Sequence, residues 1–246
     1  MTFSPCGEIV RAGDPDRFRT ALFAKPEERE HLFALYAFNL GIAEIAPMVS
    51  EPMLGEIRLQ WWREALDQIY GEGPVRQHEV TTPLADAVRT AQLPRAPFDA
   101  LIDQRAHDLD PAFPKSDAAL HGYIEATAGG LTALAAKTLA PDMTDAGMKV
   151  AQDAGFAIGA ARYLMALPDL VNAGRKPLPM ETVDALAEEG RKRLTAARAA
   201  RSTIPKTAAP SLLELTTAAH NLSSPSARSD FRERVSILWN GLRGRW

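Results

Sequence analysis

The 246-residue chain has a single cysteine, Cys6, which excludes an internal disulfide framework and any zinc site built from four cysteines. Nowhere does it contain about 18 consecutive apolar residues, so no membrane-spanning helix is expected. The N-terminal stretch MTFSPCGEIVRAGDPDRF lacks the basic start and apolar run of a signal peptide. We therefore predict a cytoplasmic protein, either free or peripheral to a membrane.

Several widespread catalytic motifs are also missing. The sequence has no phosphate-binding glycine loop, no HExxH pair and no strand-turn-helix nucleophile elbow. Its 46% hydrophobic content and net charge of −3 exclude an intrinsically disordered chain. The composition thus predicts a globular protein with a substantial core. Because these widespread motifs are missing, they assign no catalytic reaction to it.

Charge is distributed unevenly along the chain. Residues 191–246 carry 11 Lys/Arg and 3 Asp/Glu, whereas the preceding 190 residues carry 17 and 28. A basic C-terminal quarter favours an anionic partner, and we expect a membrane surface there and no nucleic acid. A second interpretation stays open, in which these arginines are solvated and have their countercharges elsewhere in the fold.

The hydrophobic periodicity is helical. Asp14-Pro15-Asp16 is typical of an N-cap followed by proline at the first helical position. Alternating apolar and polar runs typical of strands are absent from the sequence. Helices are expected at 14–24, from 26 to a kink or end at Pro47, and at 51–70, 81–92, 96–109, 116–139, 144–167, 180–201, 208–221 and 227–243. We predict an all-α helical bundle forming one domain over residues 1–246.

One acidic cluster is a candidate metal site. Asp99, Asp103 and His107 are four residues apart on a predicted helix, so they share one face. Carboxylates on one face can hold a divalent cation. A solvated surface, with Arg105 nearby to reduce the repulsion, accounts for the same pattern. We expect no metal here.

A second cluster combines aromatic and cationic residues: Arg58, Trp61, Trp62 and Arg63. Core packing explains the two tryptophans. The alternative is that the cluster forms a cavity wall, with Trp contacting an apolar chain and Arg contacting a diphosphate. The segment Tyr123–Gly130 (YIEATAGG) allows close approach of another helix or of a ligand.

Five stretches of the chain match one family in order and spacing. They are RFRTALFAKPEEREHLFALYAFNLGIAEI (17–45), GEIRLQWWREALDQIYG (55–71), LIDQRAHDL (101–109), YIEATAGGLTALAAKTL (123–139) and residues 156–179. On these motifs, clearest over residues 15–180, the chain resembles the squalene/phytoene synthase family. The resemblance implies an isoprenoid-synthase-like helical fold around a central cavity.

The family's two aspartate-rich segments, which hold Mg²⁺ and the substrate diphosphate, are degenerate in this chain. The positions matching the first pair are Ala43 and Pro47, and those matching the second pair are Ala166 and Leu170. Glu44 remains acidic in the first segment. Asp169 is displaced by one residue in the second, which turns a carboxylate by about 100° around a helix.

This degeneracy resembles the aspartate-poor branch of the family, which includes the mitochondrial assembly factor for respiratory complex I. The branch implies a non-catalytic protein without cofactor or metal, which assembles complex I subunits or intermediates at the inner face of the cytoplasmic membrane, or on the matrix side in a mitochondrion. The cavity is expected to bind a prenyl lipid such as a quinone tail. The candidate cavity residues are Tyr36, Glu44, Arg58, Trp62, Tyr123 and Gly129, with Arg162 and Arg175 as anion contacts.

Two alternatives stay open. The chain could be an active, Mg²⁺-dependent prenyltransferase for farnesyl or geranylgeranyl diphosphate, with a rearranged metal site at Glu44, Asp108 and Asp169. It could also be a prenyl-lipid carrier with no assembly role.

Overall fold

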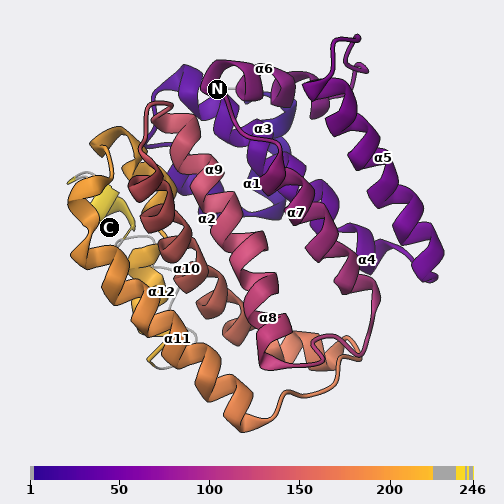
Figure 1. Cartoon of the computed structure of the whole chain (residues 1–246), viewed down its shortest axis with the longest axis vertical. Helices are drawn as coiled ribbons and strands as arrows, with labels where there is room; N and C mark the ends of the chain where they lie inside the picture. Colours follow the sequence, from indigo (N-terminus) through magenta and orange to yellow (C-terminus); the bar gives the residue numbers. More distant parts are fainter. Residues whose placement is uncertain (1–2, 224–236, 242, 244–245) are drawn as a thin grey trace.

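The computed structural model describes residues 3–223, 237–241, 243 and 246, and within this part every regular element is a helix. The all-α prediction is therefore confirmed (Figure 1). The α-helices are α1 (Pro5–Gly13), α2 (Pro15–Ala21), α3 (Pro26–Ala43), α4 (Ile45–Met48), α5 (Pro52–Tyr70), α6 (Thr81–Ala91), α7 (Ala96–Ala106), α8 (Asp117–Ile124), α9 (Gly130–Leu139), α10 (Asp145–Asn172), α11 (Met180–Ala199) and α12 (Leu215–Asn221). Short turns of other helix types, η1 (His107–Leu109), η2 (Glu125–Gly129), η3 (Arg201–Thr203) and η4 (Lys206–Leu212), join them.

Helix α3 runs through the centre of the molecule. Its residues 32–39 are all buried, and it packs against α1, α6, α7 and α9. Phe38 meets both Trp62 of α5 and Phe98 of α7 edge-on, at centroid distances of 5.3 and 5.4 Å. A helix that is apolar around its whole circumference is stable in water only when other elements cover it on all sides. The surrounding helices cover α3 in this way.

Helix α10 is the second central element, and close approach to η2 positions it. A Cβ on Gly159 would lie 2.3 Å from the Cβ of Ala128, and one on Gly155 would lie 2.6 Å from the Ala128 carbonyl oxygen. In the described part of the chain, α10 is also the one helix long and apolar enough to cross a membrane, although 50% of that apolar window is buried inside the protein. Its packing against α9, α11 and α12 is that of a core helix.

Several predicted boundaries were wrong. Helix α10 continues past Pro168 to Asn172, beyond the expected end at Leu167. Helix α1 was not predicted, although Ser4 caps it by accepting a hydrogen bond from Gly7 N at 3.1 Å. The predicted helix 116–139 contains the π-turn η2, and the predicted helix 208–221 is divided between η4 and α12.

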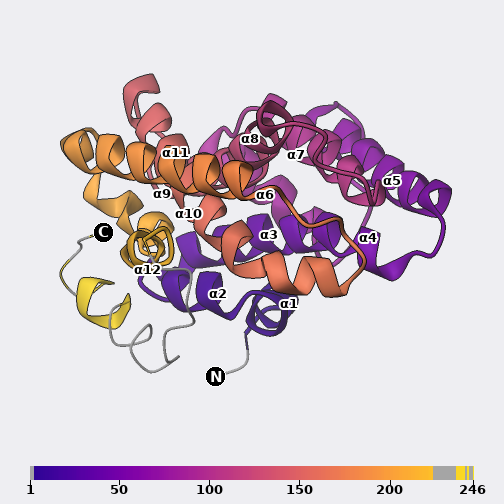
Figure 2. The ribbon, with the colours of Figure 1, turned by 90° about the horizontal axis from the view of Figure 1, so that it is seen from below.

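The last predicted helix, 227–243, lies mostly outside the described residues, and only 237–241 of it is described as helical. Figures 1 and 2 both place α5 at one end of the molecule, with α11, α12 and the C-terminus at the opposite end.

Candidate functional site

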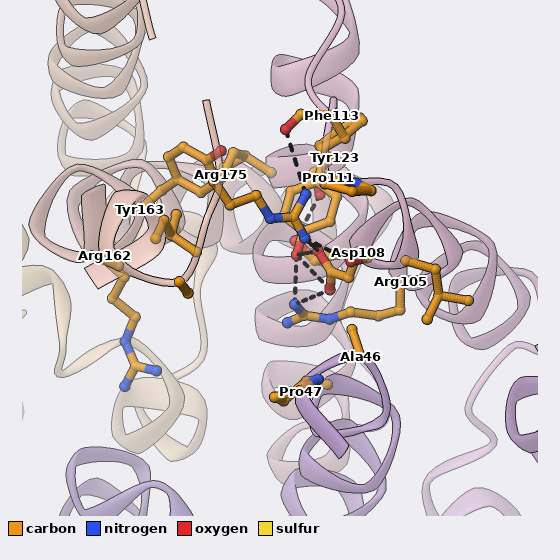
Figure 3. A pocket seen from close by; sticks show the side chains of 18 of the residues that line it. Ala46, Pro47, Arg105, Asp108, Pro111, Phe113, Tyr123, Arg162, Tyr163 and Arg175 are labelled. Atoms are coloured by element: carbon orange, nitrogen blue, oxygen red, sulfur yellow. Dashed lines mark hydrogen bonds and ion pairs between the residues drawn. The ribbon is translucent and has the colours of Figure 1, made fainter. Parts of the chain in front are cut away.

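A cavity of about 790 Å³ lies between the α3–α4 region, η1 with the loop that follows it, α8–η2 and the second half of α10. Most of its wall is apolar. The apolar lining residues are Ala43, Ala46, Pro47, Val49, Pro52, Leu109, Pro111, Phe113, Ile124, Ala128, Gly159, Ala166, Leu170, Ala173 and Gly174. The charged groups form two clusters, one around Asp108 and one around Arg162 (Figure 3). The central cavity expected from the sequence is thus present.

Asp108 in η1 is the centre of the first cluster. Its carboxylate accepts hydrogen bonds from Tyr123 Oη at 2.9 Å and from Arg105 Nη1 at 3.1 Å. The same Arg105 Nη1 donates to Tyr123 Oη at 2.5 Å. Burial raises the pKa of the Tyr123 hydroxyl well above its ordinary value of 10.0, so this hydroxyl remains a proton donor.

Arg175, in the loop after α10, completes the first cluster. Its guanidinium donates to the backbone carbonyl oxygens of Asp108 at 2.7 Å and Asp110 at 2.8 Å, and Nη2 lies 3.7 Å from the Asp108 carboxylate. Arg175 therefore ties the loop that ends α10 to η1. Counting Arg105, Arg175 and Asp108, the cluster has one formal positive charge in excess.

The second cluster joins α2, α10 and Glu214, which immediately precedes α12. Arg162 lies 2.9 Å from Asp14 and 2.7 Å from Glu214, and Arg17 lies 2.8 Å from Asp14. Both carboxylates are buried, with residue exposures of 7% and 8%. The four formal charges cancel, and in Figure 3 Arg162 points away from the Asp108 cluster.

The two carboxylates of this cluster respond differently to their surroundings. Burial by itself would raise the pKa of Asp14, but the Arg162 and Arg17 guanidiniums outweigh it and hold that pKa far below 3.8. For Glu214, burial dominates and raises the pKa above 4.5. Asp14 is therefore the principal counterion of both arginines.

Asn39 Oδ1 is a buried polar atom of the cavity lining that has no hydrogen-bond partner among the described residues. The hydroxyls of Ser50 and Tyr163, in the same lining, also lack a partner within the described part of the chain. Unpaired polar groups beside an apolar wall suit a ligand that is mostly apolar and has a polar end. Sequence reasoning missed these three residues, and also the roles of Arg17 and Arg105. For Arg105 a signal existed, because its i, i+3 spacing to Asp108 predicts an ion pair.

Of the eight candidate cavity residues, Tyr123, Arg162 and Arg175 line the cavity, and the other five do not. Tyr36 is buried beneath Arg17, whose guanidinium carbon lies 5.6 Å from the ring centroid. Trp62 is a core residue, and Gly129 faces the Gln152 carbonyl of α10, which a Cβ would approach to 3.1 Å. Glu44 and Arg58 are exposed, outside the cavity.

The four positions matched to the family's aspartates do meet at the cavity. Ala43 and Pro47 come from the α3–α4 region, Ala166 and Leu170 come from α10, and all four are lining residues. Asp108 is the single carboxylate among the lining residues of this cavity. The residues present therefore do not fit a Mg²⁺ cluster.

The other candidate metal ligands are dispersed or already paired. Glu44 and Asp169 are exposed and do not line the cavity. Asp99 pairs with Arg95 at 3.0 Å, and Asp103 pairs with Arg63 at 3.1 Å. Over residues 3–223 and the short described stretches beyond, no three His, Cys, Asp or Glu side chains are grouped as metal ligands.

Comparison with known proteins agrees with this geometry. The family model for squalene/phytoene synthase matches residues 10–231, which is most of the chain. The chain belongs to the squalene/phytoene synthase family. This family member is 32% identical over 176 residues to the bovine (Bos taurus) protein named NADH dehydrogenase (ubiquinone) complex I, assembly factor 6, a match that covers 72% of this chain. The human (Homo sapiens) protein of the same name is 31% identical over 134 residues.

The matched part of this squalene/phytoene synthase family member spans about half of the bovine relative (52%) and 40% of the human one. Two solved structures share its fold. A dehydrosqualene synthase has a TM-score of 0.78 at 15% identity, with 97% of this chain and 94% of that chain covered. A squalene synthase from Alicyclobacillus acidocaldarius has a TM-score of 0.77 at 16% identity, with 89% and 90% covered. The isoprenoid-synthase-like fold is thereby confirmed.

Proposed function

We propose that this squalene/phytoene synthase family member is a non-catalytic assembly factor for the NADH–quinone oxidoreductase, respiratory complex I. The observation that carries the proposal is the occupation of all four aspartate-matched cavity positions by Ala43, Pro47, Ala166 and Leu170. The names of the bovine and human relatives, complex I assembly factor 6, support complex I as the complex that this protein helps to assemble.

The electrostatics of the cavity support the loss of catalysis. Ionisation of an allylic diphosphate requires fixed positive charge where the leaving group develops, and every ~1.4 kcal/mol of lost stabilisation slows the reaction about tenfold. Here the charges of Arg17 and Arg162 are cancelled by Asp14 and Glu214. A single excess positive charge at the Asp108 cluster is a poor substitute for a cage of divalent cations.

We further propose that the cavity binds a prenyl lipid with a neutral or singly charged head, such as a quinone. The apolar wall suits the chain, and the unpaired Asn39 and Tyr163 groups suit hydrogen bonding to a head without strong charge. A diphosphate head would face a region with too little net positive charge to compensate its desolvation.

A peripheral position on the inner face of the cytoplasmic membrane, or on the matrix side in a mitochondrion, completes the proposal. Arg198, Arg201 and Lys206 are exposed and have no ion pair among the described residues. Such cations suit an anionic lipid surface, where each contributes about 1 kcal/mol. In contrast, Arg191, Lys192 and Arg193 are paired with Glu188 and Glu189 of their own helix.

The test has two parts. Diphosphate release from farnesyl and geranylgeranyl diphosphate with Mg²⁺ is measured beside an aspartate-bearing family member, and we expect no turnover above background from the folded chain. Deletion of the gene in its source cell should lower assembled NADH–quinone oxidoreductase, measured by native gel and NADH oxidation. Metal-dependent turnover that needs Asp108 would restore the prenyltransferase alternative, and an unchanged complex I content would favour a lipid carrier.

A further inference from the structure

The α4–α5 corner carries a group of exposed apolar side chains. Met53, Leu54 and Ile57 of α5 are 72%, 47% and 61% exposed, and Met48 of α4 is 64% exposed. These four side chains fall within ten residues of the chain. Single exposed apolar residues are ordinary on a protein surface, whereas a concentrated group marks an interaction site.

The group follows one face of a helix. Met53, Ile57 and Trp61 are spaced four residues apart and line a surface groove of about 490 Å³, together with Glu56, Gln60, Arg63 and Glu64. The buried side chains of α5 occupy the opposite face and pack on the core. Met53 and Ile57 are left uncovered on this outward face, whereas Trp61 at the end of the groove packs against the His78 ring at 5.1 Å and lies under the Arg76 guanidinium at 5.0 Å. The spacing of the apolar residues suits a second helix packed alongside.

Charge identifies the kind of helix that would fit. Exposed Glu51, which immediately precedes α5, and exposed Glu56 of α5 border this outward face, and exposed Glu44 lies close by in the chain. Glu44 and Glu51 have no ion pair among the described residues, and Glu56 reaches only Arg63, at 3.9 Å. Glu64 adds a fourth negative charge, and Arg58 and Arg63 contribute two positive charges, so these six residues carry a net charge of −2. An anionic lipid surface would be repelled by such a border, whereas Lys and Arg on a protein segment would be attracted.

We propose that the outward face of α5 binds an amphipathic helix of a partner protein whose apolar stripe is bordered by Lys and Arg. Methionine suits this role because its flexible thioether side chain adapts to partners of different shape. The proposal deepens the assembly-factor function, on which it rests, by giving the chemistry of the partner segment. Helix α5 and the basic region at the end of α11, which carries Arg198, Arg201 and Lys206, lie at opposite ends of the molecule (Figures 1 and 2). A partner helix on α5 and a membrane surface at the basic region can therefore be bound at the same time.

The experiment measures binding of a fluorescein-labelled 18-residue helical peptide of Leu and Lys to the full chain by fluorescence anisotropy. We expect saturable binding, weakened at least tenfold by the double substitution Met53→Gln/Ile57→Gln, which removes the apolar contacts without adding charge. The matched control is Met180→Gln, because Met180 is 71% exposed on α11 at a distance from this corner in sequence. It should bind the peptide as the wild type does. Glu51→Lys/Glu56→Lys should also weaken binding and reduce its dependence on salt.

Three outcomes would overturn the proposal. The first is equal weakening by Met180→Gln, and the second is equal binding of a Leu/Glu peptide. The third is binding of neutral phosphatidylcholine vesicles that is lost in Met53→Gln/Ile57→Gln while peptide binding is kept, which would make this face a lipid surface. The assay does not depend on complex I, so an unchanged complex I content after gene deletion rejects the assembly role alone and leaves the peptide result to be judged separately.

Discussion

Arg162 of α10 holds Asp14, the residue that precedes α2, through two parallel hydrogen bonds, Nη1 to Oδ2 at 2.9 Å and Nη2 to Oδ1 at 3.0 Å. The two residues are 148 positions apart in the chain. Asp14 also caps α2, because its Oδ1 accepts a hydrogen bond from Arg17 N at 3.1 Å. One carboxylate thus begins a helix and fixes it to the wall of the cavity.

We predict that Asp14→Asn destabilises the protein by about 3–5 kcal/mol, since it leaves the buried Arg17 and the partly exposed Arg162 with Glu214 as their remaining counterion. The measurement is the free energy of unfolding in urea at pH 7. The matched control is Glu8→Gln, which breaks the exposed pair with Arg11 and should change stability little. Equal effects of the two substitutions would contradict the role of Asp14.

The same substitution should change the dependence of stability on pH. The folded-state pKa of Asp14 lies far below its ordinary value of 3.8. On acidification the Asp14 carboxylate is therefore protonated in the unfolded chain at a higher pH than in the folded protein. The stabilisation by Asp14 is complete above pH 3.8 and is lost as the pH falls below it. The difference in stability between wild type and Asp14→Asn should therefore narrow in acid. A constant difference from pH 7 to pH 3 would show that Asp14 does not titrate in this way.

Sequence reasoning predicted the helices well where apolar spacing was regular, as in α5, expected at 51–70 and observed at Pro52–Tyr70. It failed where a local rule was overridden by packing. Pro168 does not end α10, and η4 replaces part of a predicted α-helix. The four positions matched to the family's aspartates by motif spacing all line the cavity. Asp14 and Asn39 were not found as site residues, since contacts across 148 positions and an unpaired amide leave no local pattern.

Two glycines near η2 should respond oppositely to alanine. A Cβ on Gly155 would lie 2.6 Å from the Ala128 carbonyl oxygen, a backbone atom that cannot turn away. A Cβ on Gly130 meets nothing within 4 Å, and the backbone there is helical. Thermal unfolding should show Gly155→Ala destabilised by about 1–3 kcal/mol and Gly130→Ala stabilised by up to about 1 kcal/mol. Stabilisation by Gly155→Ala would mean that α10 and η2 are less closely packed than described.

The single thiol should be inert in the folded protein. Cys6 is 2% exposed and donates to the Glu79 carbonyl oxygen at 3.1 Å. Burial, reinforced by Glu30 and Glu79, raises its pKa to about 12, so little reactive thiolate forms at pH 8. Reaction with a disulfide reagent should be at least about a hundredfold slower in buffer than in urea. Equal rates would show that α1 detaches readily from α3.

The exposed cations at the end of α11 give a membrane prediction. Reversal of Arg198, Arg201 and Lys206 to Glu should abolish sedimentation with anionic vesicles, because these side chains have no countercharge among the described residues. Reversal of Arg89, which is exposed on α6 and pairs with Asp86, is the control and should leave sedimentation unchanged. Sedimentation that survives the triple reversal would remove this region as the membrane contact.

The cavity itself can be tested by restoring what the chain lacks. If Ala43, Pro47, Ala166 and Leu170 face one cavity, replacing all four with Asp should create a divalent-cation site, since carboxylates converging from two helices are the ligands that Mg²⁺ and Mn²⁺ prefer. Binding to the folded state alone raises stability by about 2.7 kcal/mol at a hundred times Kd. We therefore expect the melting temperature of this variant to rise by several degrees with Mn²⁺. The same four positions changed to Asn provide a control of equal size without charge, which should not respond, and neither should the wild type. A folded Asp variant that ignores Mn²⁺ would show that the four positions do not converge, and a wild type that responds would reopen the enzyme alternative.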